Sequence, residues 1–164
     1  MITLEQLLQS RDERARHQQD LLGMYPGRSI VCLTVQFPGS LKRSPDSVMI
    51  GEAGVKALRG AFPGNEIEVR DLETGFEAYL AVGMPAQQLK RVCCGIEDTH
   101  PLGRLMDIDV ITSSGPLDRT SVGLEPRRCL ICDKPARYCM RAHSHSQAEL
   151  LDRIRQMVNA YRQG

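Results

Sequence analysis

Residues 29–37 read Ser-Ile-Val-Cys-Leu-Thr-Val-Gln-Phe, a run that is β-branched and almost wholly apolar. β-Branched residues fit a pleated surface, and a strand without a polar side has to be covered on both faces. The run therefore predicts a central strand of a sheet, with helices packed against it. Pro38-Gly39 follows directly and ends the strand, because proline cannot donate to the hydrogen-bond ladder.

The chain on either side of this strand alternates between helical and extended patterns. Its elements are expected in this order: a helix over 48–62, strands at 66–72 and 76–82 joined as a hairpin, a helix from 86 to 99, and a strand at 104–112. The first of these helices contains Gly51 and Gly54, each of which lowers helix stability by about 1 kcal/mol relative to alanine. The second helix should stop before His100-Pro101, since the residue that precedes proline avoids helical angles.

Capping motifs mark one helix near each end of the sequence. Thr3 with Gln6, and Ser146 with Glu149, have the spacing of a capping box, which satisfies two free N–H groups of a first helical turn. The second box opens a C-terminal helix over 146–162. We expect one catalytic domain over residues 1–164, an α/β fold with an α+β mixed sheet and flanking helices, and a Cys-rich C-terminal lobe that ends in this helix.

Charge and composition limit the classes of partner. Twenty-one Lys and Arg residues against 20 Asp and Glu residues leave a formal charge of +1, so no broad basic field attracts nucleic acid or an anionic membrane. The first residues contain no basic segment followed by an apolar one, and no apolar run approaches ~18 residues. We therefore expect a cytoplasmic protein with neither nucleic-acid nor membrane partners, whose six cysteines are reduced thiols or metal ligands.

The strand expected at 104–112 carries two aspartates. In Met106-Asp107-Ile108-Asp109-Val110 the period of two points the apolar side chains to one face and both carboxylates to the other, with their Cα atoms roughly 7 Å apart. Such a pair suits Mg²⁺, which takes one or two protein carboxylates together with substrate phosphates. Asp107 and Asp109 are therefore candidate Mg²⁺ ligands and catalytic residues for phosphoryl or nucleotidyl transfer. The alternative is an amphipathic strand whose polar face only meets solvent.

Two loops are candidate phosphate sites. After the first strand, Gly39 lies in a turn where backbone amides can approach an anion, and Lys42 adds a point charge. Before the aspartate strand, Gly103 permits close approach and Arg104 can grip a phosphate through two parallel hydrogen bonds. Together with the aspartates, these residues form a coherent set for a substrate that carries phosphates.

Residues 126–145 form a basic segment rich in cysteine and histidine. Its thiols and imidazoles have the spacing of a zinc site, a C-x2-C knuckle followed by a third thiol and two imidazoles: Cys129, Cys132, Cys139, His143 and His145. If Cys139 and His143 lie on a helix, their spacing of four places them on one face. Arg127 and Arg128 belong to a basic group that could bind pyrophosphate or an acidic protein, or form a solvated face.

Several of these motifs together resemble one enzyme family. They are His100-Pro101-Leu102-Gly103-Arg104-Leu105-x-Asp107-Ile108-Asp109-Val110, Pro126-Arg127-Arg128-Cys129-Leu130-x-Cys132, Cys139-x-Arg141, His145, Ser10-Arg11-Asp12-Glu13-Arg14, Pro38-Gly39 with Lys42, and residues 54–59. The sequence is similar, over nearly its whole length, to the citrate lyase holo-acyl-carrier-protein synthases, also called apo-citrate lyase phosphoribosyl-dephospho-coenzyme A transferases.

The resemblance implies a reaction and its participants. The donor would be 2'-(5''-triphosphoribosyl)-3'-dephospho-coenzyme A, the acceptor a serine of the apo acyl carrier subunit of citrate lyase, and the leaving group pyrophosphate. A nucleotidyltransferase-like fold is expected, in which Asp107 and Asp109 hold the metal while Lys42 and Arg104 stabilise the leaving group. The family's histidine position falls on His145 and not on His143, which makes His145 the fourth candidate zinc ligand.

Some roles and rival functions stay open. The base that activates the acceptor serine has four unranked candidates: Glu97, Asp98, Asp118 and Glu125. One rival function is the equivalent transfer to the carrier of malonate decarboxylase. The other is a non-catalytic zinc-binding adaptor, in which the two aspartates are only a charged strand face.

Overall fold

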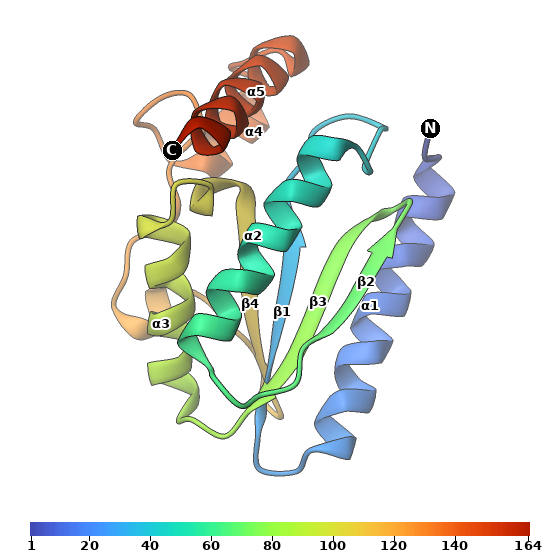
Figure 1. Ribbon diagram of the computed structural model, residues 1–164, viewed down its shortest axis with the longest axis vertical. Coiled ribbons are helices and arrows are strands. Elements are labelled where there is room, and N and C mark those ends of the chain that lie inside the picture. Colours follow the sequence, from blue (N-terminus) through green and yellow to red (C-terminus); the bar gives the residue numbers. More distant parts are fainter.

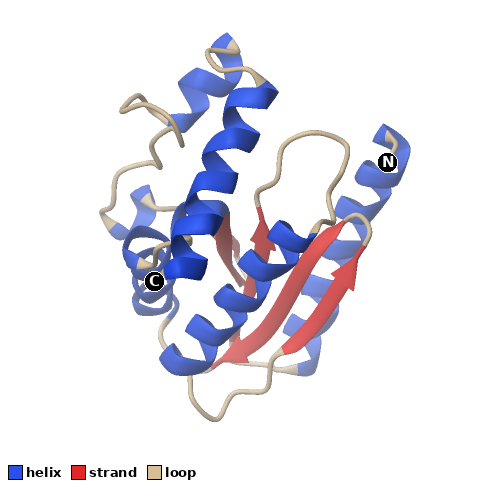
Figure 2. Ribbon diagram, turned by 45° about the horizontal axis from the view of Figure 1, so that its top comes forward, coloured by secondary structure: helices blue, strands red, loops and turns tan.

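A five-stranded sheet with helices on both faces forms the centre of the computed structural model, which describes residues 1–164 (Figures 1 and 2). The helices and strands follow in this order: α1 (Leu4–Met24), β1 (Ser29–Val35), α2 (Pro45–Ala61), β2 (Glu68–Leu72), β3 (Gly75–Val82), α3 (Ala86–Thr99), β4 (Met106–Thr112), β5 (Gly115–Leu117), α4 (Ala136–Ala142) and α5 (Gln147–Gln163). Short 3-10 turns precede β4 at Gly103–Leu105 and follow β5 at Thr120–Val122.

The elements expected from the sequence are present, with small shifts of their ends. Both capping boxes are formed, at Thr3 and at Ser146. Helix α3 ends at Thr99, directly before His100-Pro101. The α/β class with flanking helices and a C-terminal helix after the cysteine-rich segment is confirmed.

The sheet is antiparallel throughout, which corrects the expectation of a mixed sheet. The strand order is β2-β3-β1-β4-β5, and every neighbouring pair is antiparallel. Strands β1 and β2, joined through α2, run parallel, as do β3 and β4, joined through α3. Within each parallel pair, the two strands are separated by one antiparallel strand that lies between them. This is the split β-α-β, or ferredoxin-like, arrangement. The two crossovers therefore leave no parallel neighbours.

Strand β1 is the buried centre of the sheet, as its composition predicted. Residues Ile30 to Leu33 are completely buried. One face of the sheet carries the main hydrophobic core, formed with α2 and α3 and extended by Ile154 and Val158 of α5. Because this core joins elements from 31 to 158 in the sequence, α5 is anchored to the same core as the sheet.

Glycines explain how close α2 lies to the sheet. A Cβ atom on Gly51 would overlap the ring of Phe76, and one on Gly54 would lie 2.7 Å from Cδ2 of Leu33. The two residues that weakened the helix prediction are thus the residues that let the helix backbone approach β1 and β3.

Helix α1 covers the other face of the sheet, and its contacts change character along its length. A small apolar cluster joins Leu21 to Ile30, Cys32 and Tyr79. Towards the amino end of α1 the contacts are polar; Ser10, for example, hydrogen-bonds Thr74 through the two hydroxyls at 3.1 Å. This face of the sheet is therefore apolar at one end and polar at the other.

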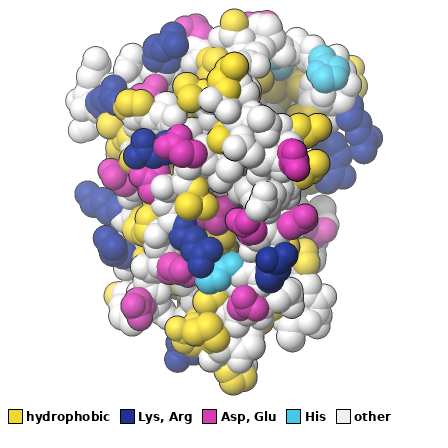
Figure 3. Space-filling view, turned by 90° about the vertical axis from the view of Figure 1, so that its right-hand side faces the viewer, with side chains coloured by type: hydrophobic (Ala, Val, Ile, Leu, Met, Phe, Trp, Pro, Cys, Tyr) yellow, Lys and Arg dark blue, Asp and Glu magenta, His cyan; other side chains and the backbone are white.

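The surface over α1 and β2 intermixes charges of both signs. Arg43 pairs with Asp71 at 2.9 Å and Arg70 with Glu68 at 3.1 Å. Figure 3 shows acidic and basic side chains interspersed over this side of the molecule. The local pattern agrees with the near-zero net charge of the sequence.

The C-terminal segment, residues 126–145, and α5 lie beyond the carboxyl end of β1 (Figure 1). An ion pair between Arg162 and Asp46 at 3.3 Å joins α5 to the first turn of α2. None of the helices combines the length and the apolarity that crossing a lipid bilayer requires.

Candidate active site

Three acidic side chains share the face of the sheet that α1 covers. In the observed register, Thr34 of β1 lies opposite both Glu77 of β3 and Asp107 of β4, and Cys32 lies opposite Asp109. Residues paired across antiparallel strands point to the same side. Asp107 and Asp109 therefore project together, with Glu77 on the far side of Thr34, while Ile108 between the aspartates is completely buried in the main core.

The backbone between the two aspartates is held by side chains of α3. Strand β5 pairs with β4 only from Val110 onward, so the outer backbone groups of Ile108 have no strand partner. The N–H of Ile108 instead donates to Glu97 Oε2 at 2.8 Å, and Nζ of Lys90 donates to its carbonyl at 3.2 Å. Both side chains are buried. They fix the strand position from which the aspartates project.

Glu97 is also the centre of an ion-pair network. Arg119 donates to its Oε1 at 2.6 Å, and Arg127 lies 3.5 Å from its Oε2. Arg127 additionally donates to the carbonyl of Met106 at 2.6 Å and to that of Gly103 at 2.9 Å. Arg127, a predicted substrate-binding residue, thus has its donors engaged by the protein, and we assign it a positioning role for the start of β4.

The aspartate pair has unbalanced charge. Burial, and then the charge of Asp107, raise the pKa of Asp109 from 3.8 to about 6. An isolated acidic strand face in solvent would not show such an effect, because water screens two exposed carboxylates. The burial of Asp109 therefore distinguishes this face from a strand face that only meets solvent.

A cavity of about 500 Å³ opens at the carboxyl end of β1, between α1, the β2–β3 turn and the C-terminal segment. Thr34 lines it, although its register partner Asp107 does not. The charged side chains on its wall are four basic residues and one acid: Arg11, Arg14, Lys42, Arg104 and Glu77. The cavity is thus suited to an anionic ligand beside the aspartate face.

In the loop after β1, Lys42 lines the cavity, whereas Gly39 packs against the start of α5. Gly39 has φ +87°, and a Cβ atom there would lie 2.5 Å from Nε2 of Gln147 at the start of α5. Lys42 donates to the carbonyl of Phe37 at 2.8 Å, and burial with the charge of Arg11 lowers its pKa. Lys42 lines the cavity and so stays a candidate substrate ligand, whereas packing and a left-handed turn already explain Gly39.

The second predicted phosphate loop has a largely structural explanation. A Cβ atom on Gly103 would collide with the last carbonyls of α3, at Ile96 and Glu97. Arg104 donates through Nε to the carbonyl of Arg128 at 2.8 Å and through Nη1 to Gln36 at 3.0 Å, and it still lines the cavity. Of this loop, only Arg104 stays a candidate substrate ligand.

Arg128 and the four candidate bases lie outside the cavity wall. Arg128 bonds the carbonyl of Asp133 and is 61% exposed. The carboxylates are engaged in other contacts: Glu97 in the network above, Asp98 with Arg119, Asp118 with the N–H of Ser121, and Glu125 with Arg128. None of the four lines the cavity.

Sequence reasoning missed three cavity residues. Arg11 and Arg14 lie on α1 within the Ser10–Arg14 motif, which carried part of the family resemblance but had no role assigned. Glu77 is only 4% exposed; its Oε1 accepts a hydrogen bond from the Tyr79 hydroxyl at 2.5 Å, and its Oε2 lies 3.8 Å from Arg14. A glutamate in an otherwise apolar strand was the available signal.

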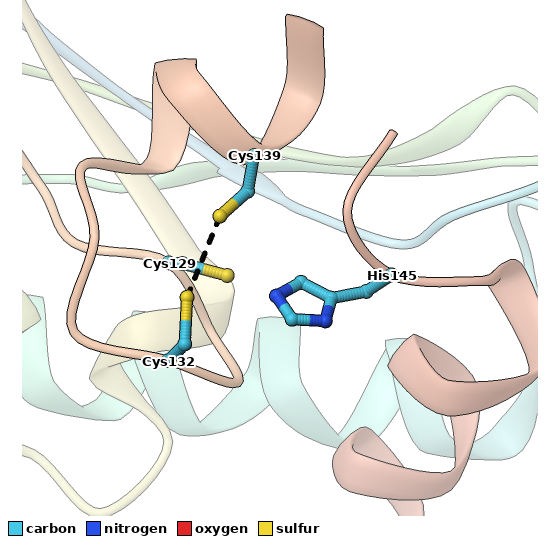
Figure 4. A group of neighbouring side chains, drawn as sticks. All are labelled: Cys129, Cys132, Cys139 and His145. Atoms are coloured by element: carbon cyan, nitrogen blue, oxygen red, sulfur yellow. Dashed lines mark hydrogen bonds between the residues drawn. The ribbon is translucent and has the colours of Figure 1, made fainter. Parts of the chain in front are cut away.

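The predicted Cys/His set is brought together in the C-terminal segment. The ligand atoms of its four members all lie within 4.8 Å of one another: Cys129, Cys132, Cys139 and His145. Figure 4 shows the imidazole of His145 directed at the thiols. His143 instead follows α4 with φ +49° and stands outside the group, so the helical pairing of Cys139 with His143 is not the arrangement found.

The surroundings of Cys129 favour the deprotonated form of its thiol. Burial acts to raise the pKa of Cys129, but hydrogen bonds from the N–H groups of Ile131 and Cys132, together with those from the thiols of Cys139 and Cys132, lower the pKa to about 7. The sulfur atoms of Cys132 and Cys139 are 3.4 Å apart. The C-x2-C turn thus carries backbone donors aimed at its first sulfur.

The chain is similar to known proteins along almost its entire length. A family model described as apo-citrate lyase phosphoribosyl-dephospho-CoA transferase matches residues 2–161. A probable apo-citrate lyase phosphoribosyl-dephospho-CoA transferase of Streptococcus pyogenes serotype M18 is 36% identical over 167 residues, covering 98% of this chain and 87% of the relative. The apo-citrate lyase phosphoribosyl-dephospho-CoA transferase of Escherichia coli O1:K1 is 37% identical over 164 residues, covering 96% and 89%.

Proposed function

Because the chain belongs to the apo-citrate lyase phosphoribosyl-dephospho-CoA transferase family, we propose that it attaches the phosphoribosyl-dephospho-CoA group to a serine of the apo acyl carrier subunit of citrate lyase. The donor is triphosphoribosyl-dephospho-CoA, and pyrophosphate leaves. The observation that supports this activity most directly is the aspartate pair on β4, which shares a sheet face with a cavity lined by basic residues.

The cavity wall suits a polyphosphate. Arg11, Arg14, Lys42 and Arg104 come from three separate parts of the chain and supply four positive charges around one space. A triphosphate carries several negative charges, and guanidinium groups match phosphate oxygens in pairs. The half of the lining that is apolar offers surface to the remaining, less charged part of the donor.

The residues at the aspartate pair fit Mg²⁺. Asp107 and Asp109 are neighbouring carboxylates on one face of a rigid strand, and burial of Asp109, followed by the charge of Asp107, raises the pKa of Asp109 to about 6. When bound there, Mg²⁺ would neutralise phosphate charge and favour attack at phosphorus. Two protein carboxylates are enough, because this ion keeps water and substrate oxygens as its other ligands.

In the reaction, the serine oxygen of the carrier forms a bond to the α-phosphorus of the donor. The bond from that phosphorus to the bridging oxygen breaks, and the electron pair leaves with pyrophosphate. Arg14, Lys42 and Arg104 stabilise the negative charge that develops on the leaving group. The serine hydroxyl has to lose its proton, and Glu77 is the only carboxylate on the cavity wall that can accept it.

The test is the intact mass of purified carrier subunits after incubation with the protein, Mg²⁺ and triphosphoribosyl-dephospho-CoA. The apo carrier of citrate lyase should gain the mass of phosphoribosyl-dephospho-CoA, and an equimolar amount of pyrophosphate should appear. The apo carrier of malonate decarboxylase is the matched substrate control and should gain nothing. Modification of the second carrier alone would overturn the proposed acceptor, and modification of neither, with donor proven active, would overturn the activity.

A further inference from the structure

We propose that this chain holds a structural Zn²⁺ ion through four side chains of its C-terminal segment: Cys129, Cys132, Cys139 and His145. The site lies outside the aspartate face and does not depend on the proposed transfer reaction. It joins three pieces of chain, because the first two cysteines lie in a loop, Cys139 lies on α4 and His145 lies in the turn before α5. A single ion would tie these pieces together.

The ligand geometry is close to that of a tetrahedral zinc site. Three thiols and one imidazole are a common structural set, and metal–ligand bonds of the usual lengths place ligand atoms roughly 3.5–3.8 Å apart. The four candidate atoms lie within 4.8 Å of one another, and the closest pair of sulfurs is 3.4 Å apart. Side-chain movements of less than about 1 Å would complete the site, a shift that rotation about staggered bonds accommodates.

The loop that carries the first two cysteines is built like a zinc knuckle. The N–H of Ile131 donates to Sγ of Cys129 at 3.4 Å. At the base of the loop, the N–H of Cys129 donates to the carbonyl of Lys134 at 2.8 Å, and that of Ala136 donates to the carbonyl of Arg127 at 2.9 Å. Backbone donors aimed at a ligand sulfur are favourable when that sulfur carries negative charge.

His145 supplies an independent indication of a ligand. Its Nε2 atom is buried and has no hydrogen-bond partner. Its other ring nitrogen, Nδ1, lies 3.9 Å from Oε2 of Glu149, whose Oε1 accepts the N–H of Ser146 in the capping box. Metal-bound histidines usually have a carboxylate near one ring nitrogen, while the other ring nitrogen has no protein hydrogen-bond partner and is directed at the metal site. Left without an ion, a buried polar atom of this kind is unfavourable, because it has lost its hydrogen bond to water and gained none in return.

The segment also lacks the apolar core that would order it by itself. Within residues 126–145, Cys139 is the only buried residue. A stretch of this length cannot stabilise itself through hydrophobic burial, and small metal-bound units use the ion in its place. The segment nevertheless forms part of the cavity wall through Cys129, Leu130 and Cys139. The carbonyl of Arg128, next to the first ligand, also positions Arg104.

A disulfide is the competing use of these thiols. The sulfurs of Cys132 and Cys139 are near enough for oxidation to bring them together. That bond would leave Cys129 and Nε2 of His145 without a partner, whereas an ion engages all four groups. The two uses give different products, since a disulfide removes two protons and two electrons from the thiols and binds no metal.

Metal content of the purified full-length protein tests the proposal. Protein produced in zinc-supplemented medium and passed through a desalting column should retain about one zinc ion per chain by elemental analysis. Replacement of the ion by Co²⁺ should give the intense visible bands of a tetrahedral thiolate site. The variants Cys129→Ala and His145→Ala should lose at least about nine-tenths of the zinc, with matched controls Cys94→Ala and His143→Ala retaining it.

The outcomes separate the proposal from its rivals and from failure to fold. Circular dichroism of each variant reports on the sheet and helices, and the Co²⁺ spectrum of the unmodified chain needs no variant at all. Zinc-free wild-type protein without cobalt bands would overturn the site, as would a Cys132–Cys139 disulfide found by mass spectrometry of the native protein. Equal zinc loss in the control variants would also count against it. None of these readouts uses transfer activity, so a failed transfer reaction leaves the zinc result unchanged.

Discussion

Two regions of this protein carry clustered ligand side chains, and they are ordered by different forces. The aspartates project from β4, whose apolar side is buried and whose free backbone is held by Glu97 and Lys90. The Cys/His segment, residues 126–145, has one buried residue and is held by loop hydrogen bonds, by the contacts of Arg127 with β4 and by Leu130 at the edge of the main core. The aspartate site is therefore positioned by the fold before any ion binds. In the second, by our proposal, the ion completes the fold.

Among the tests of this difference, removal of one aspartate charge should have the largest effect. Asp109→Asn should lower the rate of carrier modification by about 10³-fold, because an amide cannot replace the carboxylate of an electrostatic site. The circular dichroism spectrum should be unchanged, since the strand is held by other groups. Asp98→Asn, on the exposed side of α3, is the matched control and should retain near-normal turnover. A variant at position 109 with full activity would remove Asp109 from the mechanism.

The network behind β4 should matter for stability. Glu97→Gln keeps the shape but removes the charge that Arg119 and Arg127 share, and breaking such a buried set costs about 3 kcal/mol. Because the chain has no tryptophan, urea unfolding followed by circular dichroism measures the loss of stability. Asp98 contacts the same Arg119 but is 53% exposed, so Asp98→Asn should cost less than about 1 kcal/mol. Equal losses in the two variants would show that burial does not set the strength of this network.

Metal removal should affect only the second region. Treatment with a zinc chelator should reduce amide-exchange protection over 126–145 by about 100-fold, whereas β1 and β4 should keep theirs. Hydrogen exchange measured by mass spectrometry resolves the two regions within one sample. If protection falls equally in the sheet, the proposed division between a self-sufficient sheet and a metal-ordered segment is wrong.

The burial of Asp109 has a pH signature. Its pKa is raised from 3.8 to about 6 in the folded protein, so this carboxyl favours folding while protonated, and that contribution is lost as the pH rises through about 6. Asp109→Asn should therefore be more stable than wild type by ~3 kcal/mol at pH 7, with the difference vanishing below about pH 4. Thermal unfolding of both proteins across this range measures it. A constant difference would mean that the titration of Asp109 is not its cause.

Helix packing on the sheet gives the smallest test. Gly51→Ala should destabilise the fold by about 1–2 kcal/mol, because the new Cβ atom overlaps the Phe76 ring. Gly60→Ala, in the same helix with open space around it, should be stabilising by about 0.5–1 kcal/mol. Denaturant midpoints of the two variants make the comparison. The same sign at both positions would show that helix propensity, and not the close approach of α2, governs this interface.

The sequence supported local features well and long-range ones poorly. A continuous apolar run located β1, and period-two and helical patterns located β3, β4 and the long helices, because a single segment is enough to reveal which of its faces is buried. Spacing alone selected the cysteines that converge. The seven-residue α4 and the three-residue β5 are too short for a period to show; a helix at Cys139 was considered only as a possibility, and β5 was not expected.

The missed parts depend on contacts between distant segments. Antiparallel order follows from which strand fills the gap left by each crossover, and no single segment encodes that choice. Arg127 was expected to bind substrate, but its partners lie 21 to 30 positions away in the chain. Glu77 joined the site only through its register with Thr34. Residue type indicated charge in each case, and tertiary placement determined its use.

The way β4 is finished has a consequence for self-association. An open strand edge is a template on which another chain can add a strand and begin an aggregate. Here Glu97 and Lys90 occupy the edge at Ile108, and the three-residue β5, with Pro116 at its centre, covers the rest. At the opposite border, β2 displays Glu68, Arg70 and Asp71. The edge at Ile108 is therefore occupied by side chains, and the outer edge of β2 carries charges of both signs, and both features disfavour edge-to-edge addition of another strand.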